Sequence, residues 1–120
     1  MEKLIAQGVA FFLIRDGGAP VGCGGIQLMG TDYGEVKRMY VRPQFRGLGF
    51  AKLMLSHLAD YARSHGVETL RLETGIHQHE AIALYEQMGF VRFPDDDFQP
   101  EGAELVMAYR LSLVKRDHDT

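Results

Sequence analysis

The spacing of apolar residues predicts three strands in the first third of the chain. Residues 10–15 and 20–29 are mostly apolar, and the glycine-rich turn at 16–18 between them predicts a hairpin. At 35–41, apolar residues stand among charged ones, as in a strand with one buried face. The 20–29 segment is rich in glycine, which indicates a place where another backbone or a ligand approaches closely.

In the rest of the chain, helices are expected to alternate with strands. Apolar residues recur at helical spacing up to about residue 65 and again over 79–88. Gly66 and Gly89 follow these two segments and are expected to end the helices. Further strands are predicted at 67–74, 90–93 and 104–113, with an exposed loop at 95–102 and a frayed tail at 115–120.

The order of these elements predicts an α/β fold with a mixed central sheet. The first long helix separates 35–41 from 67–74, and it is the crossover that a parallel strand pair requires. Residues 2–7 are expected to form the end of a helix, with Gly8 as its cap. At 120 residues, the chain is expected to be one domain over 1–114.

Composition and charge limit the cellular compartment and the classes of binding partner that are expected for the protein. The 13 Lys and Arg residues are outnumbered by 16 Asp and Glu residues, for a net charge of −3, and they form no dense basic segment. Nucleic acid is therefore not expected as a partner, whereas a cationic substrate such as an amine suits the charge. No apolar run approaches the roughly 20 residues of a membrane span, and no signal peptide is recognisable. With Cys23 as its single cysteine, the protein is expected in the reducing cytoplasm, without a membrane partner.

The stretch at 41–53 carries the clearest functional signal. A strand is followed by a turn with two glycines and then by a helix, which leaves backbone N–H groups without intrahelical partners. These donors and the positive end of the helix dipole favour an anion. Gly47 and Gly49 allow a phosphate to reach the backbone, Ala51 lets it approach the first helical turn, and two arginines flank the turn. The pattern predicts a pyrophosphate site; the alternative is an ordinary strand–turn–helix connection.

Two common phosphate-binding turns do not fit this stretch. A P-loop needs Lys-Ser/Thr directly after Gly49, which is absent, and a dinucleotide-binding turn needs a third glycine where Lys52 stands. The pattern that is present is Gln44-x-x-Gly47-x-Gly49-x-Ala51 after a strand. It resembles the acetyl-CoA-binding motif of the GNAT N-acetyltransferase superfamily.

A second motif supports the same resemblance. Residues 81–90 read A-x-x-L-Y-x-x-x-G-F, which is similar to the family's second motif on the CoA side. Gln78 stands three residues before it, where many relatives have an asparagine, and keeps an amide group there. The two motifs are independent, correctly ordered and correctly spaced, so the chain is identified as a member of the GNAT superfamily.

The resemblance implies a GNAT-like mixed sheet, with acetyl-CoA as co-substrate and an amine as acetyl acceptor. The acceptor, a small molecule or a protein amine, would attack directly in a ternary complex. The family's usual first strand and most of its first two helices are expected to be missing, so the fold would be N-terminally shortened. The alternative is a catalytically silent acyl-CoA-binding module with a role in regulation or assembly. A homodimer paired through sheet edges is also considered.

The resemblance places Tyr85 beside the thioester sulfur, where it would protonate or hydrogen-bond the leaving thiolate. An ordinary tyrosine has a pKa of about 10 and a thiol one of about 8.5, so full proton transfer is uphill by roughly 2 kcal/mol. Tyr85 is therefore expected to stabilise the thiolate more than to protonate it. The alternative is a core aromatic residue on the apolar face that includes Ile82 and Met88.

Two carboxylates are candidates for the base that deprotonates the amine. Glu35 matches the position of the general base in some relatives; the alternative is a solvated residue beside Lys37. Glu73 is the second candidate, because such strand ends face the cleft in open sheets. No metal is expected, since the pair His77-x-His79 has no nearby set of carboxylate and cysteine ligands, and two histidines without one rarely form a metal site.

Acetyl-CoA is expected to bind mainly through backbone groups. The same resemblance implies that backbone groups of Met39 and Val41 hydrogen-bond the pantetheine arm like an added strand, and that one of their N–H groups polarises the thioester carbonyl. The expected acetyl-CoA-binding residues are Met39, Val41, Gln44, Phe45, Arg46, Gly47, Leu48, Gly49, Phe50, Ala51, Lys52, Gln78 and Tyr85.

Overall fold

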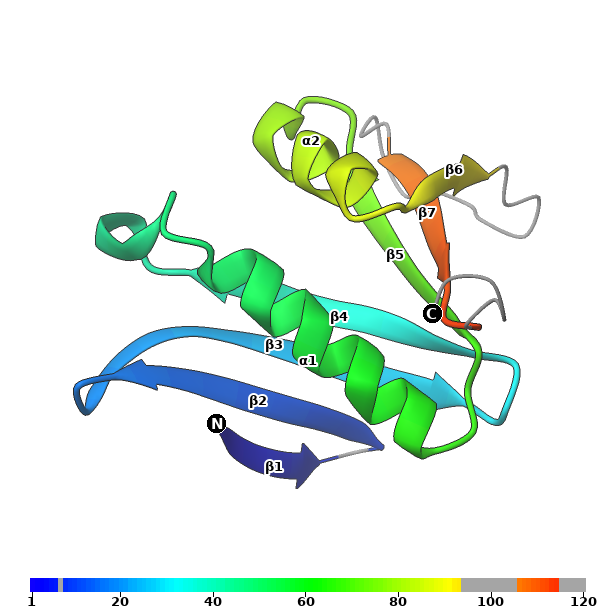
Figure 1. The fold of residues 1–120 in the computed structure, drawn as a ribbon, viewed down its shortest axis with the longest axis horizontal. Coiled ribbons are helices and arrows are strands. Elements are labelled where there is room, and N and C mark those ends of the chain that lie inside the picture. Colours follow the sequence, from blue (N-terminus) through cyan, green and yellow to red (C-terminus); the bar gives the residue numbers. More distant parts are fainter. Residues whose placement is uncertain (7, 94–105, 115–120) are drawn as a thin grey trace.

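In the computed structural model, which describes residues 1–6, 8–93 and 106–114, the chain folds around one seven-stranded sheet. Helix α1 lies across one face of the sheet, and α2 lies beside the end of β5 (Figure 1). The strand order across the sheet is β1-β2-β3-β4-β5-β7-β6. The elements are β1 (Glu2–Ala6), β2 (Val9–Asp16), β3 (Ala19–Met29), β4 (Tyr33–Val41), the 3₁₀ turn η1 (Pro43–Phe45), α1 (Phe50–Ser64), β5 (Thr69–Gly75), α2 (His79–Gln87), β6 (Val91–Phe93) and β7 (Val106–Ser112).

The predicted α/β fold with a mixed sheet is confirmed. Helix α1 connects β4 to β5, and these two strands run parallel, with Glu35 opposite Arg71. All other neighbouring strands of the described sheet are antiparallel. The strand expected at 104–113 is β7, whereas the loop expected at 95–102 and the tail expected at 115–120 lie outside the described residues.

Residues 2–6 form a strand, so the prediction of a helix end at 2–7 was wrong. β1 pairs antiparallel with β2 along its whole length, and Arg15 binds Glu2 with 2.6 Å between Nε and Oε1. Gly8, at the link, has a φ of +79°, a conformation suited to a tight return of the chain. Pairing with β2 supplies backbone hydrogen bonds that a single helical turn would lack.

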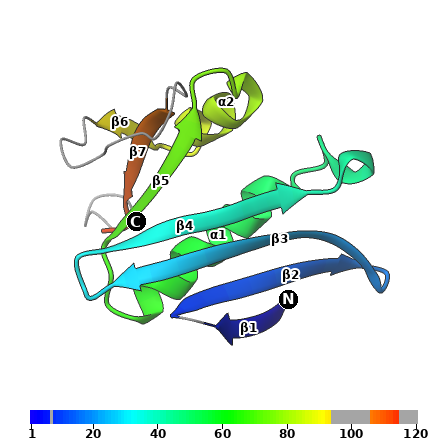
Figure 2. The ribbon, with the colours of Figure 1, turned by 180° about the vertical axis from the view of Figure 1, so that it is seen from behind.

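The hydrophobic core lies between the sheet and α1. Burial of one large apolar side chain contributes roughly 1.5–3 kcal/mol, and α1 buries Met54, Leu55 and Leu58 along one stripe. The core positions of the sheet alternate along β2 and β5, so the intervening side chains face away from α1. Figure 2 shows this reverse face, over which neither described helix lies. The buried sheet residues on the α1 side include Ala10, Phe12, Ile14, Val21, Ile26, Leu70 and Leu72.

Neither of the two helices that the structure describes is long and apolar enough to cross a membrane.

Candidate active site

An irregularity in β4 interrupts the regular sheet near its centre. Cys23 of β3 lies opposite Tyr40 of β4. Two residues later, Gly25 lies opposite Lys37, three residues before Tyr40, so β4 contains one extra residue. This is a β-bulge, and Arg38 within it has a φ of +39°, which is uncommon for residues other than glycine. The bulge therefore bends β4 at the point where its second half begins.

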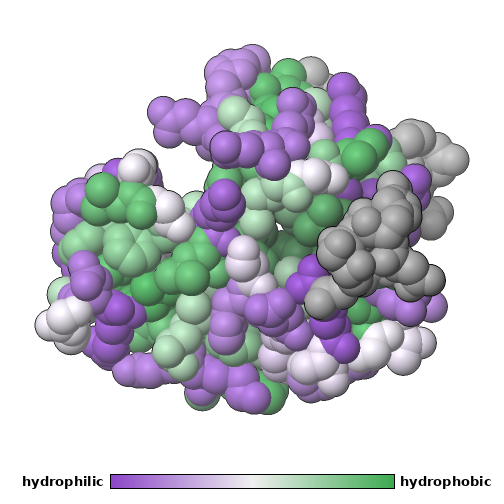
Figure 3. Space-filling view, in the orientation of Figure 1, coloured by the Kyte–Doolittle hydropathy of each residue, from purple (hydrophilic) through white to green (hydrophobic). Residues whose placement is uncertain are grey.

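β4 and β5 separate just before the bulge. Over the described residues, their pairing stops at Glu35 and Arg71, although both strands continue. Figures 1 and 2 show β4 and β5 diverging toward their carboxyl ends. The space-filling view shows a hollow between the segment around η1 and the segment around α2, with hydrophobic residues on its floor (Figure 3). The divergence creates an opening in the sheet, lined by the free edge of β4.

The glycine turn, residues 42–49, lies on one side of this opening and leads into α1. Gly47 and Gly49 have φ values of +79° and +88°, and a Cβ at either position would meet nothing within 4 Å. Glycine is therefore suited to this turn by its backbone conformation rather than by crowding. Gly49 is the N-cap of α1, which has no side-chain cap and no acidic residue in its first turn. The amide groups at this helix end remain available to an anion.

Two arginines anchor the glycine turn to the sheet. Arg42 donates through its backbone N–H to the Val21 carbonyl at 2.8 Å and through Nη1 to the Pro20 carbonyl at 3.1 Å. Arg46 donates through Nε to the Val41 carbonyl at 2.9 Å. These bonds tie the turn to β3 and β4, so its position follows from the sheet.

The side chains of the turn differ in their surroundings. The rings of Phe45 and Phe50 meet edge to face at 6.2 Å, and both pack against the core. Leu48 is 67% exposed, and Gln44 and Lys52 are also exposed. Any contact of the two phenylalanines with a ligand at the turn would therefore be mainly through their backbone.

Tyr85 of α2 is buried, with 8% of its surface exposed. Its ring centroid lies 5.7 Å from that of Phe90 and 6.3 Å from that of Tyr109. Tyr109 pairs with Leu72 on the α1 side of the sheet, and its hydroxyl donates to Glu86 Oε1 at 3.2 Å. Tyr85 is thus packed in the core, as expected in the alternative interpretation of this residue as a core aromatic. Sequence reasoning missed Tyr109, although the alternating pattern of the last strand could have placed it inside.

Burial raises the pKa of the Tyr85 hydroxyl above its ordinary value of 10. The side chain is therefore neutral at physiological pH and a hydrogen-bond donor. Proton transfer from Tyr85 to a thiolate is more unfavourable than for an exposed tyrosine. The environment favours hydrogen bonding to an anion over release of the proton.

The two candidate bases lie on the opposite side of the sheet from α1. Glu35 is 24% exposed, and its Oε1 lies 3.4 Å from Lys37 Nζ, two residues along the same strand. Glu73 is exposed between the buried Leu72 and Thr74. Both carboxylates are close to the point where β4 and β5 separate, whereas Tyr85 packs on the other side.

The start of α2 contains the remaining predicted site residue. Gln78 is the N-cap, its N–H donates to the Gly75 carbonyl at 3.0 Å, and its side chain makes no capping hydrogen bond. The rings of His77 and His79 are 6.4 Å apart. In the described part of the chain, no group of three His, Cys, Asp or Glu residues could hold a metal ion.

Comparison with known proteins identifies the family of this chain. The model of the acetyltransferase (GNAT) family matches residues 2–90, which include β1, the glycine turn and α2. The chain belongs to the GNAT family. The membership expected from the two motifs is thereby confirmed.

Several N-acetyltransferases are similar to this GNAT chain. An IAA acetyltransferase from Azospirillum brasilense is 38% identical over 109 residues, covering 89% of this chain and 71% of that protein. The N-acetyltransferase YsnE from Bacillus subtilis is 35% identical, covering 75% of this chain and 61% of that protein. The chain thus spans about two thirds of the length of these relatives.

Solved structures confirm the GNAT fold. A Klebsiella pneumoniae structure assigned to the acyl-CoA N-acyltransferases is 41% identical, with a TM-score of 0.81, and covers 92% of this chain and 77% of that one. The ribosomal-protein-S18-alanine N-acetyltransferase from Escherichia coli is 24% identical, with a TM-score of 0.78, and covers 97% of this chain and 76% of that one. The second likeness concerns the fold alone.

The raised pKa of Tyr85 can be tested by ultraviolet titration. The absorbance step present in the wild type and absent in Tyr85→Phe should lie above pH 10, because burial disfavours the phenolate. The stabilisation from the neutral phenol is complete below about pH 10 and is lost as the pH rises through the folded-state pKa. The free energy of unfolding should therefore fall more steeply above pH 10 in the wild type than in Tyr85→Phe. A difference step below pH 10 would contradict this assignment.

Proposed function

We propose that this protein is an N-acetyltransferase that transfers the acetyl group of acetyl-CoA to a primary amine by direct attack. The observation that carries the proposal is the opening between β4 and β5, with an anion-binding helix end beside it. An ordinary strand–turn–helix connection would not require its neighbouring strands to separate. The combination suits a cofactor with a pyrophosphate at one end and a long extended arm at the other.

In this proposal, the pyrophosphate binds the amide groups of the glycine turn and the first turn of α1. The exposed Lys52 and the outward part of the Arg46 guanidinium add positive charge there. The pantetheine arm lies along the edge of β4 at Met39 and Val41, where it forms the hydrogen bonds that β5 does not. One amide group of this edge polarises the thioester carbonyl.

Tyr85 then approaches the thioester sulfur from the side of the sheet that carries the helices. Its hydroxyl donates a hydrogen bond to the thiolate that leaves as the amine displaces CoA. The raised pKa supports this role over that of a full proton donor. The amine loses its proton to a base on the other side of the sheet.

Glu35 and Glu73 remain the two candidates for that base, acting directly or through water. Glu35 already binds one ammonium group, that of Lys37, which supports an affinity of this position for cations. Glu73 lies on the same face, further toward the carboxyl end of β5. From either position the base would serve an amine that adds to the thioester carbonyl from the face opposite α1. The tetrahedral intermediate then loses the ammonium proton to the base and expels the CoA thiolate beside Tyr85.

The comparisons support acetyl-CoA as the co-substrate. A GNAT acetyltransferase from Elizabethkingia anophelis, with acetyl-CoA bound, has a TM-score of 0.76 to this chain at 17% identity. An N-acetyltransferase from Campylobacter jejuni in complex with acetyl-CoA has a TM-score of 0.69 at 21% identity. Both likenesses concern the fold, and calorimetry on this chain measures the binding itself.

Calorimetric titration with acetyl-CoA and with ATP tests the glycine turn. Acetyl-CoA should bind, and Gly49→Ala should weaken it at least about tenfold, because a side chain at this φ strains the backbone by roughly 1–2 kcal/mol and blocks the anion. Gly66→Ala is the matched control. Gly66 has a φ of +76° and open space around its Cβ position, but it follows the opposite end of α1.

The control should lose similar stability and keep its affinity for acetyl-CoA. Equal or exclusive binding of ATP would overturn the proposal. Binding of acetyl-CoA without turnover on any amine would favour the silent binding module instead.

Steady-state kinetics on an amine panel test Tyr85. Tyr85→Phe should lower kcat roughly 10- to 100-fold, the loss of one hydrogen bond to a charged group, and leave the Kd of acetyl-CoA unchanged. Tyr109→Phe is the control, because its hydroxyl is bonded to Glu86 instead. An unchanged kcat in Tyr85→Phe would restrict this tyrosine to core packing.

The pH dependence of kcat/KM separates the two carboxylates. Replacing the true base with glutamine should lower kcat/KM by roughly 10²-fold or more at neutral pH. The loss should shrink toward pH 10, because an alkylammonium with a pKa of about 10 then deprotonates without help. Glu35→Gln and Glu73→Gln serve as each other's control. If both substitutions lower kcat/KM by a similar small factor, neither residue is the base.

A further inference from the structure

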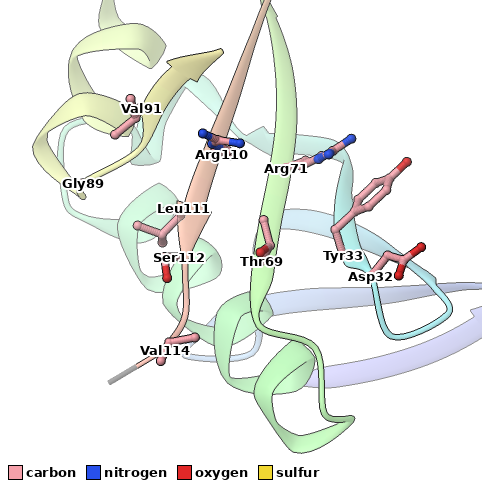
Figure 4. A pocket seen from close by; sticks show the side chains of 10 residues that line it. All are labelled: Asp32, Tyr33, Thr69, Arg71, Gly89, Val91, Arg110, Leu111, Ser112 and Val114. Atoms are coloured by element: carbon pink, nitrogen blue, oxygen red, sulfur yellow. The ribbon is translucent and has the colours of Figure 1, made fainter. Parts of the chain in front are cut away.

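A second candidate site lies at the other end of β4 from the glycine turn. A cavity of about 850 Å³ opens there, in the size range of small-molecule sites. Tyr33 begins β4 and Val41 ends it, so at about 3.3 Å per residue the two lie roughly 25 Å apart. The cavity is lined by Asp32, Tyr33, Thr69, Arg71, Gly89, Val91, Arg110, Leu111, Ser112 and Val114 (Figure 4).

Two arginines of the cavity stand directly opposite each other in the sheet. Arg71 of β5 is paired with Arg110 of β7, and both alternate with buried residues that face α1. Their side chains therefore share the face opposite α1. Like charges directly opposite each other on two strands are destabilising. A sheet that carries such a pair gains stability when an anion binds between or beside them.

The guanidinium groups of these arginines lie against aromatic rings, although Glu35 pairs with Arg71 and Glu73 stands two residues further along the same face. The guanidinium carbon of Arg71 lies 4.1 Å from the ring centroid of Tyr33 and 5.0 Å from the ring centroid of Phe93. The guanidinium carbon of Arg110 lies 5.4 Å from the ring centroid of Phe93. In Figure 4, Arg71 lies beside Tyr33, and Arg110 lies across β7 toward β6. Stacking on rings holds a guanidinium in place but leaves its in-plane N–H donors unused.

Hydrogen bonding at Arg71 is incomplete within the described structure. Its Nε is buried and has no hydrogen-bond partner there. No described carboxylate forms an ion pair with Arg71 or Arg110, and Asp32 is the one acidic residue in the lining. A buried, unpartnered N–H of a charged group is rare in native proteins and calls for a binding partner.

We propose that this cavity binds a small organic anion, whose carboxylate or phosphate group accepts hydrogen bonds from Arg71 and Arg110 and whose flat part packs beside Tyr33. Arginine suits such a group because its planar donors match two oxygens at once. The proposal does not depend on acetyl transfer, since it involves none of the residues assigned to the acetyl-CoA site.

Benzoate, inorganic phosphate and benzamide serve as probes in a titration of the intact protein. Comparison of benzoate with phosphate shows whether the cavity prefers a carboxylate or a phosphate group. Benzamide has the same ring as benzoate but no charge. Binding is measured by calorimetry, and the ¹⁵N–¹H resonance of Arg71 Nε reports on the atom without a partner. At least one of the two anions should bind and shift this resonance, whereas benzamide should do neither.

Substitutions test the assignment to this arginine pair. Arg71→Lys keeps the charge but loses the planar donors, and Arg110→Gln removes an exposed charge; each should weaken binding about tenfold or more. Arg92→Gln is the matched control, because Arg92 is an exposed arginine of β6 paired with Tyr109, on the other face. Thermal unfolding checks that each variant folds.

Three results would overturn the proposal. They are the absence of binding by either anion, an equal loss of affinity in Arg92→Gln, and binding that leaves the Arg71 Nε resonance unshifted. Failure of acetyl-CoA to bind at the glycine turn would leave this proposal unaffected.

Discussion

The β-bulge in β4 is the constraint on which the candidate active site depends. Hydrogen bonds in a regular parallel pair continue at even spacing, so without the bulge β4 and β5 would remain paired toward their carboxyl ends. The extra residue opposite Gly24 bends β4 just after its last pair with β5, that of Glu35 with Arg71, and the sheet is open from there. The positive φ of Arg38 carries strain of order 1–3 kcal/mol, which the surrounding sheet and α1 must hold in place. The opening is thus built into the fold.

The position of the glycine turn relative to this opening is fixed by the sheet at one end and by α1 at the other. Arg42 is bonded to β3 and Arg46 to β4, so the turn cannot move without moving the strands. Meanwhile Gly49 begins α1, whose buried stripe is packed on the same sheet. The first amide groups of α1 therefore point to a fixed place relative to the edge of β4. Such preorganisation lowers the cost of binding a flexible cofactor.

The face of the sheet opposite α1 carries two different charge arrangements. Near the opening, Glu35 and Lys37 form an ion pair, and Glu73 stands nearby on β5. Next to Glu35, Arg71 faces Arg110 across the strand pair, and both guanidinium groups lie against aromatic rings. One sheet face thus offers acidic groups suited to an amine and basic groups suited to an anion. These groups belong to β4, β5 and β7, which are separated along the chain. Cross-strand pairing places them on one face of the sheet.

The amino-acid sequence by itself determined the helices, most of the strands, and the glycine turn with the family it indicates. These features rest on local patterns: apolar periodicity, glycines at helix ends, and a motif within ten residues of chain. It failed at residues 2–6, because pairing with β2 decides their conformation and a five-residue segment has little preference of its own. Only the tertiary structure revealed the bulge, the burial of Tyr85 against Tyr109, and the opposition of Arg71 and Arg110. Each of these depends on strand register, which is set by contacts between distant segments and leaves no mark in the local sequence.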